Sequence, residues 1–446
     1  MPALKPVNAL PTKSFFVEMF TKDIPLDQAI LDLVDNSVDA ARRSPKAGEL
    51  PFDGYRVELT FDSSSFLLFD NAGGFTASAA ADYAFRFGRP PGAKREANSI
   101  GRFGVGMKRA LFKFGDEFTV SSATEAEEWA IHVDVKDWED EDKSWDFPWA
   151  KFVPKSEVSI QRPGTEVYVT KLHRSVSSVF GSTSFKSQII KLIRAKHREF
   201  ISQGLEILVN GERVPNLELS IYFGEEVKPG VWRHDFDTVD GHKVAVKIIA
   251  GVGKSVPRAA GWYIICNGRL IREADKRTET GWGIVEDVAS KSIIPGFHNQ
   301  FARFRGVVTF EASDSTHIPW NTTKTDIDPD NTIWLAVRQQ MMTMMRPVID
   351  FLNELDADID VHTRERSPLY RLVEGQPLKS VDGIRRIRDL TLPERDTLAE
   401  VVIYIKIQYP KEKEKVEALK EALGADSARA VGIKTFDLIY ARQFPR

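Results

Sequence analysis

Three aspartates and an asparagine recur at helical spacing near the start of the chain. If residues 29–40 form a helix, at about 100° per residue, Asp32, Asp35, Asn36 and Asp39 share one face. Apolar residues, Leu33, Val34, Val38 and Ala41, fall on the other. Carboxylates crowded on one helical stripe repel each other unless positive charge lies among them. A Mg²⁺ ion with a phosphate behind it would supply that charge. The alternative is a solvated polar face.

Further segments could bind the rest of a nucleotide. An apolar strand, 66–69, ends at Asp70, with Ala72, Gly73 and Gly74 close behind. Residues 99–108 contain Gly101, Gly104 and Gly106 and run into a segment of helical pattern. Such a loop lets backbone N–H groups and a helix dipole face phosphate. An ordinary flexible loop is the alternative. Residues 163–167, Pro-Gly-Thr-Glu-Val, open another strand.

In this order and spacing, the four segments resemble the ATP-binding motifs of the GHKL superfamily, which includes DNA gyrase, heat-shock chaperone ATPases, sensor histidine kinases and MutL. The resemblance implies ATP and Mg²⁺ as cofactors. It implies that Asn36 is the metal ligand and that Asp70 accepts a hydrogen bond from the adenine amine. The implied cofactor-binding residues are Asn36, Asp39, Asp70, Gly73, Gly74, Gly101, Gly104, Val105, Gly106, Lys108 and Thr165.

Two positions depart from the family pattern. Relatives that hydrolyse ATP usually carry glutamate four residues before the asparagine, whereas this chain has Asp32. Aspartate is one methylene shorter, and a general base must lie within hydrogen-bond reach of its water. Asp32 is therefore either a weaker base or set on a closer backbone. The other departure is Ala72, where many relatives have glycine. A small residue is tolerated there if its φ is negative.

The elements that position these residues alternate between helix and strand. The pattern predicts helices over 14–43, broken near residues 23–25, and over 76–85 and 185–203. It predicts strands over 55–61, 65–70, 117–122, 129–135, 166–170, 205–210, 218–223, 241–250, 262–271 and 303–311. Residues 86–105 are predicted to be a mobile loop and residues 137–155 an acidic, Trp-rich excursion. Helices on one face of a mixed sheet predict an α/β (α+β) sandwich, the Bergerat-type fold that the resemblance implies.

A second unit is predicted to follow the ATP domain. The predicted boundaries are 1–175 for the ATP-binding domain, 180–330 for a smaller, transducer-like α/β domain and 331–446 for a helical C-terminal region. Residues 318–326 resemble the segment by which transducers send a lysine to the γ-phosphate, so Lys324 joins Asp32 as a candidate catalytic residue. A surface lysine is the alternative interpretation.

The composition of the chain limits its possible partners and its cellular compartment. The net charge of −3 gives no global basic field for nucleic acid. A single cysteine, Cys266, excludes an intramolecular disulfide framework. No stretch approaches the roughly 20 apolar residues of a membrane span. We therefore expect a cytoplasmic protein without a membrane partner.

The leading functional hypothesis is a slow ATPase of the MORC or MutL-like branch. ATP would close the lid, dock Lys324 and drive N-terminal dimerisation into a homodimeric clamp. DNA is a partner by family analogy alone. The alternative is a nucleotide-gated scaffold, or a chaperone-like protein, with little or no hydrolysis. A histidine kinase is disfavoured because the residues before Asp32 contain no histidine.

Overall fold

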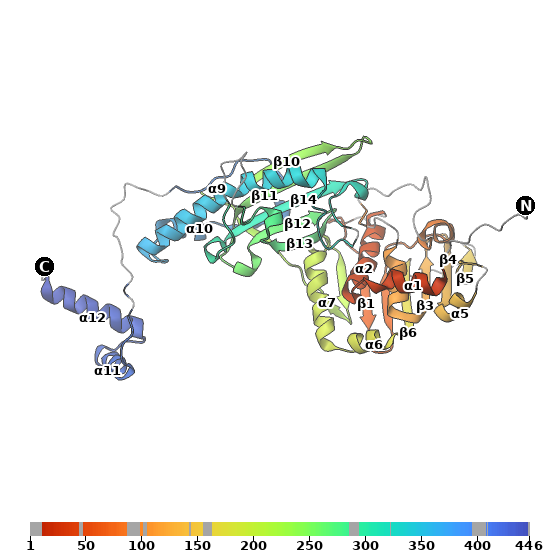
Figure 1. Ribbon diagram of the computed structural model, residues 1–446, viewed down its shortest axis with the longest axis horizontal. Helices are drawn as coiled ribbons and strands as arrows, with labels where there is room; N and C mark the ends of the chain where they lie inside the picture. The colour runs from red at the N-terminus through yellow and green to blue at the C-terminus, as the bar shows by residue number, and fades with distance from the viewer. Residues whose placement is uncertain are drawn as a thin grey trace, which may run out of the picture.

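The computed structural model describes residues 11–43, 48–86, 99–100, 105–141, 144–154, 163–284, 294–321, 323–394, 407 and 409–444. Within these ranges two sheets carry most of the strands, and helices cover one side of each. The fold is the expected mixed α/β class with helices at the C-terminal end (Figure 1).

The first sheet has eight strands in the order β5-β4-β3-β6-β2-β1-β7-β8. Its strands are β1 (Arg56–Phe61), β2 (Phe66–Asp70), β3 (Gly115–Ala123), β4 (Glu127–Asp134), β5 (Trp149–Pro154), β6 (Gly164–Leu172), β7 (Glu206–Val209) and β8 (Glu212–Arg213). Among the described strands of this sheet, only the β1–β7 pair is parallel. Because β7 and β8 follow residue 175, the sheet extends past the predicted end of the first domain, and the three boundaries stay a prediction.

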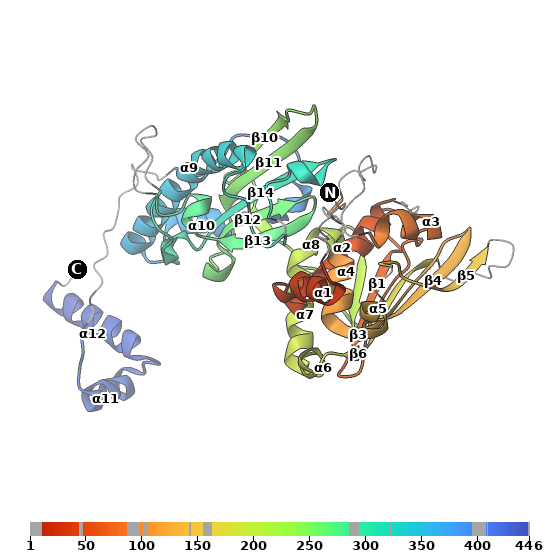
Figure 2. The same ribbon diagram turned by 45° about the vertical axis from the view of Figure 1, so that its right-hand side comes forward.

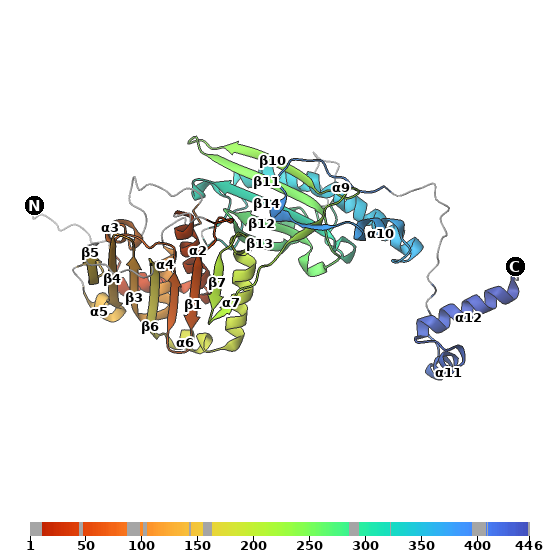
Figure 3. The same ribbon diagram turned by 180° about the vertical axis from the view of Figure 1, so that it is seen from behind.

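Helices pack on one face of this sheet. They include α1 (Lys13–Lys22), α2 (Leu26–Arg43), α4 (Gly106–Phe114), α5 (Val135–Asp140) and α6 (Arg174–Phe180). Figure 1 shows α1 and α5 in front of the strands, and Figure 3, from behind, shows the strands facing the viewer. Burial alternates along β2, as expected for a sheet covered on one side. This layer is the predicted sandwich.

The second sheet has five strands in the order β10-β11-β14-β12-β13. They are β10 (Gly230–Asp237), β11 (Lys243–Val252), β14 (Phe304–Ala312), β12 (Gly261–Cys266) and β13 (Arg269–Asp275). The long helix α9 (Thr332–His362) packs against β11 and β14. Its buried methionines, Met341 and Met345, fill the core between them. Positive φ at both Asn267 and Gly268 forms the tight turn between β12 and β13.

Three sequence predictions need correction. Residues 137–155 are not wholly an excursion, because they include most of α5 and all of β5. The helix expected over 185–203 is two helices, α7 (Thr183–Lys196) and α8 (Arg198–Ser202), separated at His197. The predicted helix over 76–85 is one short turn, α3 (Ala77–Ala79), followed by a π-helical turn, Ala80–Ala84. Most of the predicted mobile loop, 86–105, lies outside the described residues.

The remaining elements include α10 (Pro368–Glu374) and a two-stranded sheet of β9 (Ser220–Tyr222) and β15 (Leu378–Ser380). The last two helices, α11 (Lys413–Leu423) and α12 (Ala428–Gln443), pack on each other and stand apart from both sheets in every view (Figures 1–3). None of the described helices is long and apolar enough to cross a membrane.

Candidate active site

Helix α2 carries the acidic residues, and it lies at the junction between the two sheets (Figure 2). It is buried almost all round, including the carboxylates of Asp32, Asp35 and Asp39, which are 8%, 0% and 7% exposed. Asn36 differs from these three aspartates because it is exposed. The alternative interpretation, a solvated polar face, is therefore excluded for the three aspartates. Each of them has a protein partner instead.

Asp35 is held in a buried ionic cluster that joins α2 to the second sheet. The Arg269 guanidinium, from the start of β13, contacts one carboxylate oxygen. His197 Nε2 lies 2.9 Å from the same oxygen, Oδ1. Lys324 Nζ donates to the other oxygen, Oδ2, at 2.9 Å. The side chains of Asp35, Arg269 and His197 are fully buried. Sequence reasoning assigned no role to Arg269 or His197, because neither lies in a motif and only the fold brings them to α2.

The charges of this cluster shift each other's ionisation. Burial alone would raise the pKa of Asp35, but Arg269, Lys324 and His197 lower it well below its usual range. Burial lowers the pKa of His197 despite the neighbouring carboxylate, so the ring is neutral and donates to Asp35. Burial would lower the pKa of Lys324, but Asp35 and Asp32 raise it. The cluster is thus two cations on a shared carboxylate, with a neutral imidazole beside them.

The two predicted catalytic residues, Asp32 and Lys324, contact each other. The Lys324 ammonium Nζ also lies 3.2 Å from Asp32 Oδ1. The backbone at Lys324 has φ of +55°, an uncommon conformation for a residue with a side chain. The Lys324 loop is closed by hydrogen bonds from Asn321 N to Asp326 O and from Lys324 N to Asn321 O. Asp326 in turn binds Arg272 on β13. The second sheet therefore holds this lysine against α2.

The predicted adenine side forms around Asp70 at the end of β2. Asp70 is buried, and its Oδ2 accepts a hydrogen bond from the Ser37 hydroxyl at 2.8 Å. Its Oδ1 accepts the Ala72 N–H at 3.0 Å. Burial raises the Asp70 pKa, against the effect of these bonds. Thr165 on β6 lies opposite Asp70 in the sheet register. Ser37 was missed, although its position directly after Asn36 places it on α2.

The glycines near Asp70 have the conformations that the motif needs. Gly73 and Gly74 have φ of +89° and +66°. A Cβ added to Gly74 would come within 2.2 Å of the Ala123 carbonyl oxygen, so no larger residue fits without rearrangement. Ala72 is not among the described residues with positive φ. The substitution of alanine for the usual glycine is therefore tolerated, as expected.

The N-terminus of α4 lies beside Asp32. A Cβ built on Gly106 would lie 3.0 Å from Asp32 Cβ and 3.2 Å from its Oδ2. Val105, at the N-cap, provides no side-chain cap for the first turn. Lys108 is fully buried, and its Nζ donates to the carbonyls of Ala84 and Arg86. Burial lowers its pKa to about 7.

Not every predicted residue can be placed. Gly101 and Gly104 lie outside the described residues. Asp39 is bound by segment 99–100 rather than facing an open site. Its Oδ2 accepts the Ser99 hydroxyl at 2.7 Å, and its Oδ1 accepts the Ile100 N–H at 2.8 Å. The Asn267 amide from the β12–β13 turn donates to the Ser99 carbonyl at 3.2 Å. This turn therefore connects the second sheet to the residues beside the glycine segment.

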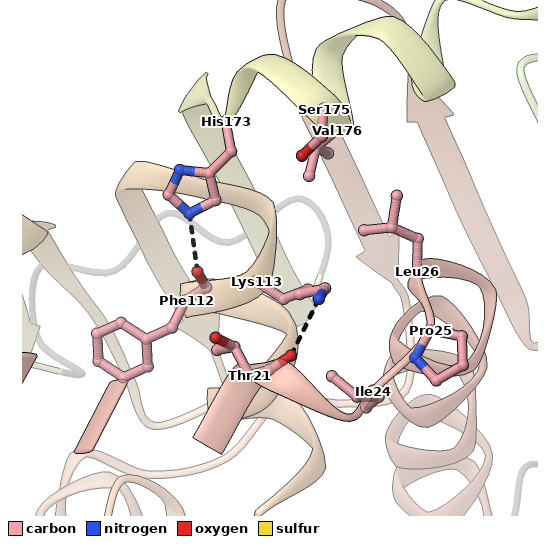
Figure 4. Close-up of a pocket in the computed structure, with 9 residues that line it drawn as sticks. All are labelled: Thr21, Ile24, Pro25, Leu26, Phe112, Lys113, His173, Ser175 and Val176. Atoms are coloured by element: carbon pink, nitrogen blue, oxygen red, sulfur yellow. Dashed lines mark hydrogen bonds between the residues drawn. The ribbon is translucent and has the colours of Figure 1, made fainter. Parts of the chain in front are cut away.

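A pocket on the ATP-domain side lies away from these residues. It has a volume of about 340 Å³ and is found at the C-terminal end of α4, whereas Gly106 and Lys108 are at the N-terminal end. Figure 4 shows Lys113 bonded to the Thr21 carbonyl and His173 bonded to the Phe112 carbonyl. Both polar groups are thus occupied by the backbone, and no predicted site residue that the structure describes lines this pocket.

Comparison with known protein families identifies the family of residues 24–165. The family model described as histidine kinase-, DNA gyrase B- and HSP90-like ATPase matches residues 24–165. Residues 24–165 belong to the GHKL ATPase superfamily. The match spans α2, β2, α4 and the first residues of β6, which carry the four motifs. No curated protein matches the sequence. The GHKL domain is an ATP-binding module of the ATPase type, and this supports the fold and cofactor class predicted from the motifs.

Proposed function

We propose that this chain is a slow Mg-ATP hydrolase whose second sheet senses the nucleotide through Lys324. Asp32 is the general base that deprotonates the attacking water, and Lys324 is the cation that meets the γ-phosphate. The observation that carries the proposal is the contact between the two side chains, in which Lys324 Nζ lies 3.2 Å from Asp32 Oδ1. Asp32 belongs to the helical layer of the first sheet, whereas Lys324 lies in a loop that follows the second sheet.

The surrounding residues fit Mg-ATP. Asn36 is an exposed amide one helical turn after Asp32, so its oxygen is free of the ion pairs that occupy Asp32 and Asp35. We therefore propose Asn36 as the Mg²⁺ ligand, and a bound ion would neutralise phosphate charge. Asp70 orients the adenine amine, with Gly73 and Gly74 beneath the base and Thr165 beside it. The first turn of α4, from Val105 to Lys108, faces the phosphates.

The Asp32–Lys324 pair defines a resting arrangement. An aspartate whose oxygen binds an ammonium is a poor acceptor for a water proton. A γ-phosphate competes for that ammonium, because it carries more negative charge than one carboxylate. ATP binding would then draw Lys324 from Asp32 and release the base, and the loop would move with the second sheet. Lid closure and N-terminal dimerisation, as in the MORC and MutL layout, belong to the same proposal.

The second candidate function is a nucleotide-gated scaffold. The shorter Asp32 side chain favours it, since misplacement on the order of 1 Å can cost about 100-fold in rate. We test the pair of functions with the full chain. Steady-state Mg-ATP turnover, together with a nucleotide-dependent shift from monomer to dimer by light scattering, supports the ATPase clamp. Dimerisation with bound ATP but no turnover favours the scaffold. If saturation with ATP gives no turnover and no change in mass, both functions are contradicted.

DNA is proposed as the substrate of the clamp on family analogy alone. If DNA is the partner, binding will weaken steeply with added salt, because phosphate contacts release counterions. Absence of salt-sensitive binding at low ionic strength would leave a protein partner as the alternative.

A further inference from the structure

A cluster of two histidines and an aspartate lies at the tip of the β10–β11 hairpin. Pairing of Val244 with Ala312 sets the start of β11 beside the end of β14. The hairpin turn therefore lies over the short helical turn Ser315–His317, which follows β14. One ligand atom each of Asp240, His242 and His317 lies within 4.8 Å of the others. In Figure 1, β10 and β11 run together to this tip.

One nitrogen atom of the cluster, His317 Nε2, is buried and lacks a hydrogen bond to any residue that the structure describes. It nevertheless lies 3.1 Å from Asp240 Oδ2, with an orientation unsuited to a hydrogen bond. The rings of His242 and His317 face each other, with centroids 5.2 Å apart. A buried nitrogen without a bond is costly, and a shared cation would satisfy it.

Hydrogen bonds of Thr238 orient the Asp240 carboxylate. The Thr238 hydroxyl donates to Asp240 Oδ1 at 2.6 Å and accepts the His242 N–H at 3.0 Å. The remaining oxygen, Oδ2, is therefore turned towards His317. Supporting hydrogen bonds of this kind hold metal ligands in the orientation that the ion needs.

Asp314 lies on the same side of the cluster as His317. Asp314 uses Oδ1 to cap the turn, accepting the Thr316 N–H at 2.9 Å. Its Oδ2 lies 4.0 Å from His317 Nε2. Tetrahedral sites for zinc-like ions take three or four such nitrogen and oxygen ligands.

We propose that Asp240, His242 and His317 bind a divalent transition-metal ion of the zinc class. Imidazole with carboxylate favours such an ion over Mg²⁺ or Ca²⁺, which prefer oxygen ligands alone. Metal–ligand bonds are about 2.0–2.2 Å, so the ligand atoms must close together slightly. The exposed side chains of Asp240 and His242 can rotate to do so.

The site has a structural consequence for the lysine loop. His317 is followed by Ile318, Pro319 and Trp320, and the Trp320 indole donates to the Ser315 carbonyl at 3.2 Å. Trp320 leads directly into the loop that carries Lys324. A bound ion would fasten the hairpin tip to the start of that loop. It would thereby stabilise the position from which Lys324 reaches α2.

The test uses the full chain without an affinity tag, stripped of metal and free of nucleotide. Co²⁺ is titrated in the presence of excess Mg²⁺, which occupies sites made of oxygen ligands. We expect visible d–d bands of a low-coordinate Co²⁺ site, which disappear on addition of Zn²⁺. His242→Gln should weaken Co²⁺ binding at least about 10-fold. His242 is exposed, so this variant is expected to fold.

The matched control is His234→Gln, which changes an exposed histidine of the same hairpin outside the cluster. It should leave the bands unchanged. Absence of the bands in the wild type overturns the proposal, as do bands that persist in both His242→Gln and His317→Gln. Because no ATP is present, this outcome is independent of whether the chain hydrolyses nucleotide.

Discussion

The Lys324 ammonium lies 3.2 Å from Asp32 Oδ1 and 2.9 Å from Asp35 Oδ2, so one side chain of the second unit bridges two carboxylates of α2. Asp35 has a second cation, Arg269, whereas Asp32 shares an ion pair only with Lys324 among the described residues. Loss of Lys324 to a phosphate would therefore leave Asp35 paired and Asp32 free. This difference suits Asp32 as the general base and Asp35 as a structural anchor one helical turn away.

Asp32→Asn should abolish most ATP turnover while nucleotide binding survives. Asparagine keeps the shape of the side chain but cannot accept the proton of the attacking water. We expect a fall of about 10²–10⁴-fold in kcat, the usual contribution of a general base. Turnover and nucleotide affinity are measured side by side. Asp437→Asn, an exposed change on α12, is the control. Unchanged turnover in Asp32→Asn would remove Asp32 as the base.

Lys324→Ala should lower ATP turnover and also change the mobility of α2. Removing the ammonium frees Asp32 but deprives the γ-phosphate of its cation, so kcat falls more than nucleotide affinity does. Lys324→Arg should recover part of kcat because it keeps the charge. Lys254→Ala, an exposed lysine of the second unit, should behave as the wild type. Equal kcat in Lys324→Ala and wild type would show that Lys324 is only an anchor for Asp35.

The motifs on α2, β2 and α4 were predictable because each is continuous in sequence and has its own backbone signature. Gly73 and Gly74 need positive φ, and the periodicity of 29–40 predicts a helix. The choice of Lys324 as a candidate catalytic residue came from resemblance, and its contact with Asp32 was not predicted, since nothing local links the two residues. The positive charge expected among the carboxylates was assigned to a metal ion with a phosphate behind it, whereas the fold also places Arg269 and Lys324 beside Asp35.

His197 shows where sequence reasoning ends. In the sequence it is a lone histidine in a predicted continuous helix, with no spacing that indicates a site. In the fold it ends α7, is completely buried and bonds to Asp35. The Asp240, His242 and His317 cluster is similar, because its members become neighbours only through the pairing of β11 with β14. Contacts between residues far apart in the sequence create both sites, and such contacts cannot be recognised from a single sequence.

Arg269→Ala should destabilise the folded chain by about 3–5 kcal/mol, because it leaves a buried carboxylate with one cation fewer. The Asp35→Ala/Arg269→Ala double variant should cost less than the sum of the two single variants, since it removes both charges. Unfolding in denaturant gives all three free energies. Arg258→Ala, an exposed arginine in the same unit, is the control. Additive free energies would show that the two groups do not interact.

The same cluster gives an acid dependence. The folded pKa of Asp35 is below its unfolded value, so its contribution to stability is present above the unfolded pKa. That contribution is lost as the pH falls from about 5 towards the folded pKa. Asp35→Asn should therefore flatten the acid limb of the stability profile, measured by unfolding between neutral and acidic pH. An acid limb identical to that of the wild type would contradict the depressed pKa.

Lys108 should give a pH dependence on the alkaline side. Its folded pKa is about 7, below the ordinary value of 10.5, because burial disfavours the ammonium. Between these values the unfolded chain holds a proton that the folded chain lacks, so stability rises with pH across this window. Lys108→Met should reduce that rise, seen as a smaller difference in the free energy of unfolding between neutral and alkaline pH. Lys191→Met, an exposed change on α7, should retain the full rise. The same slope in Lys108→Met and wild type would mean that Lys108 stays charged when buried, held by the Ala84 and Arg86 carbonyls alone.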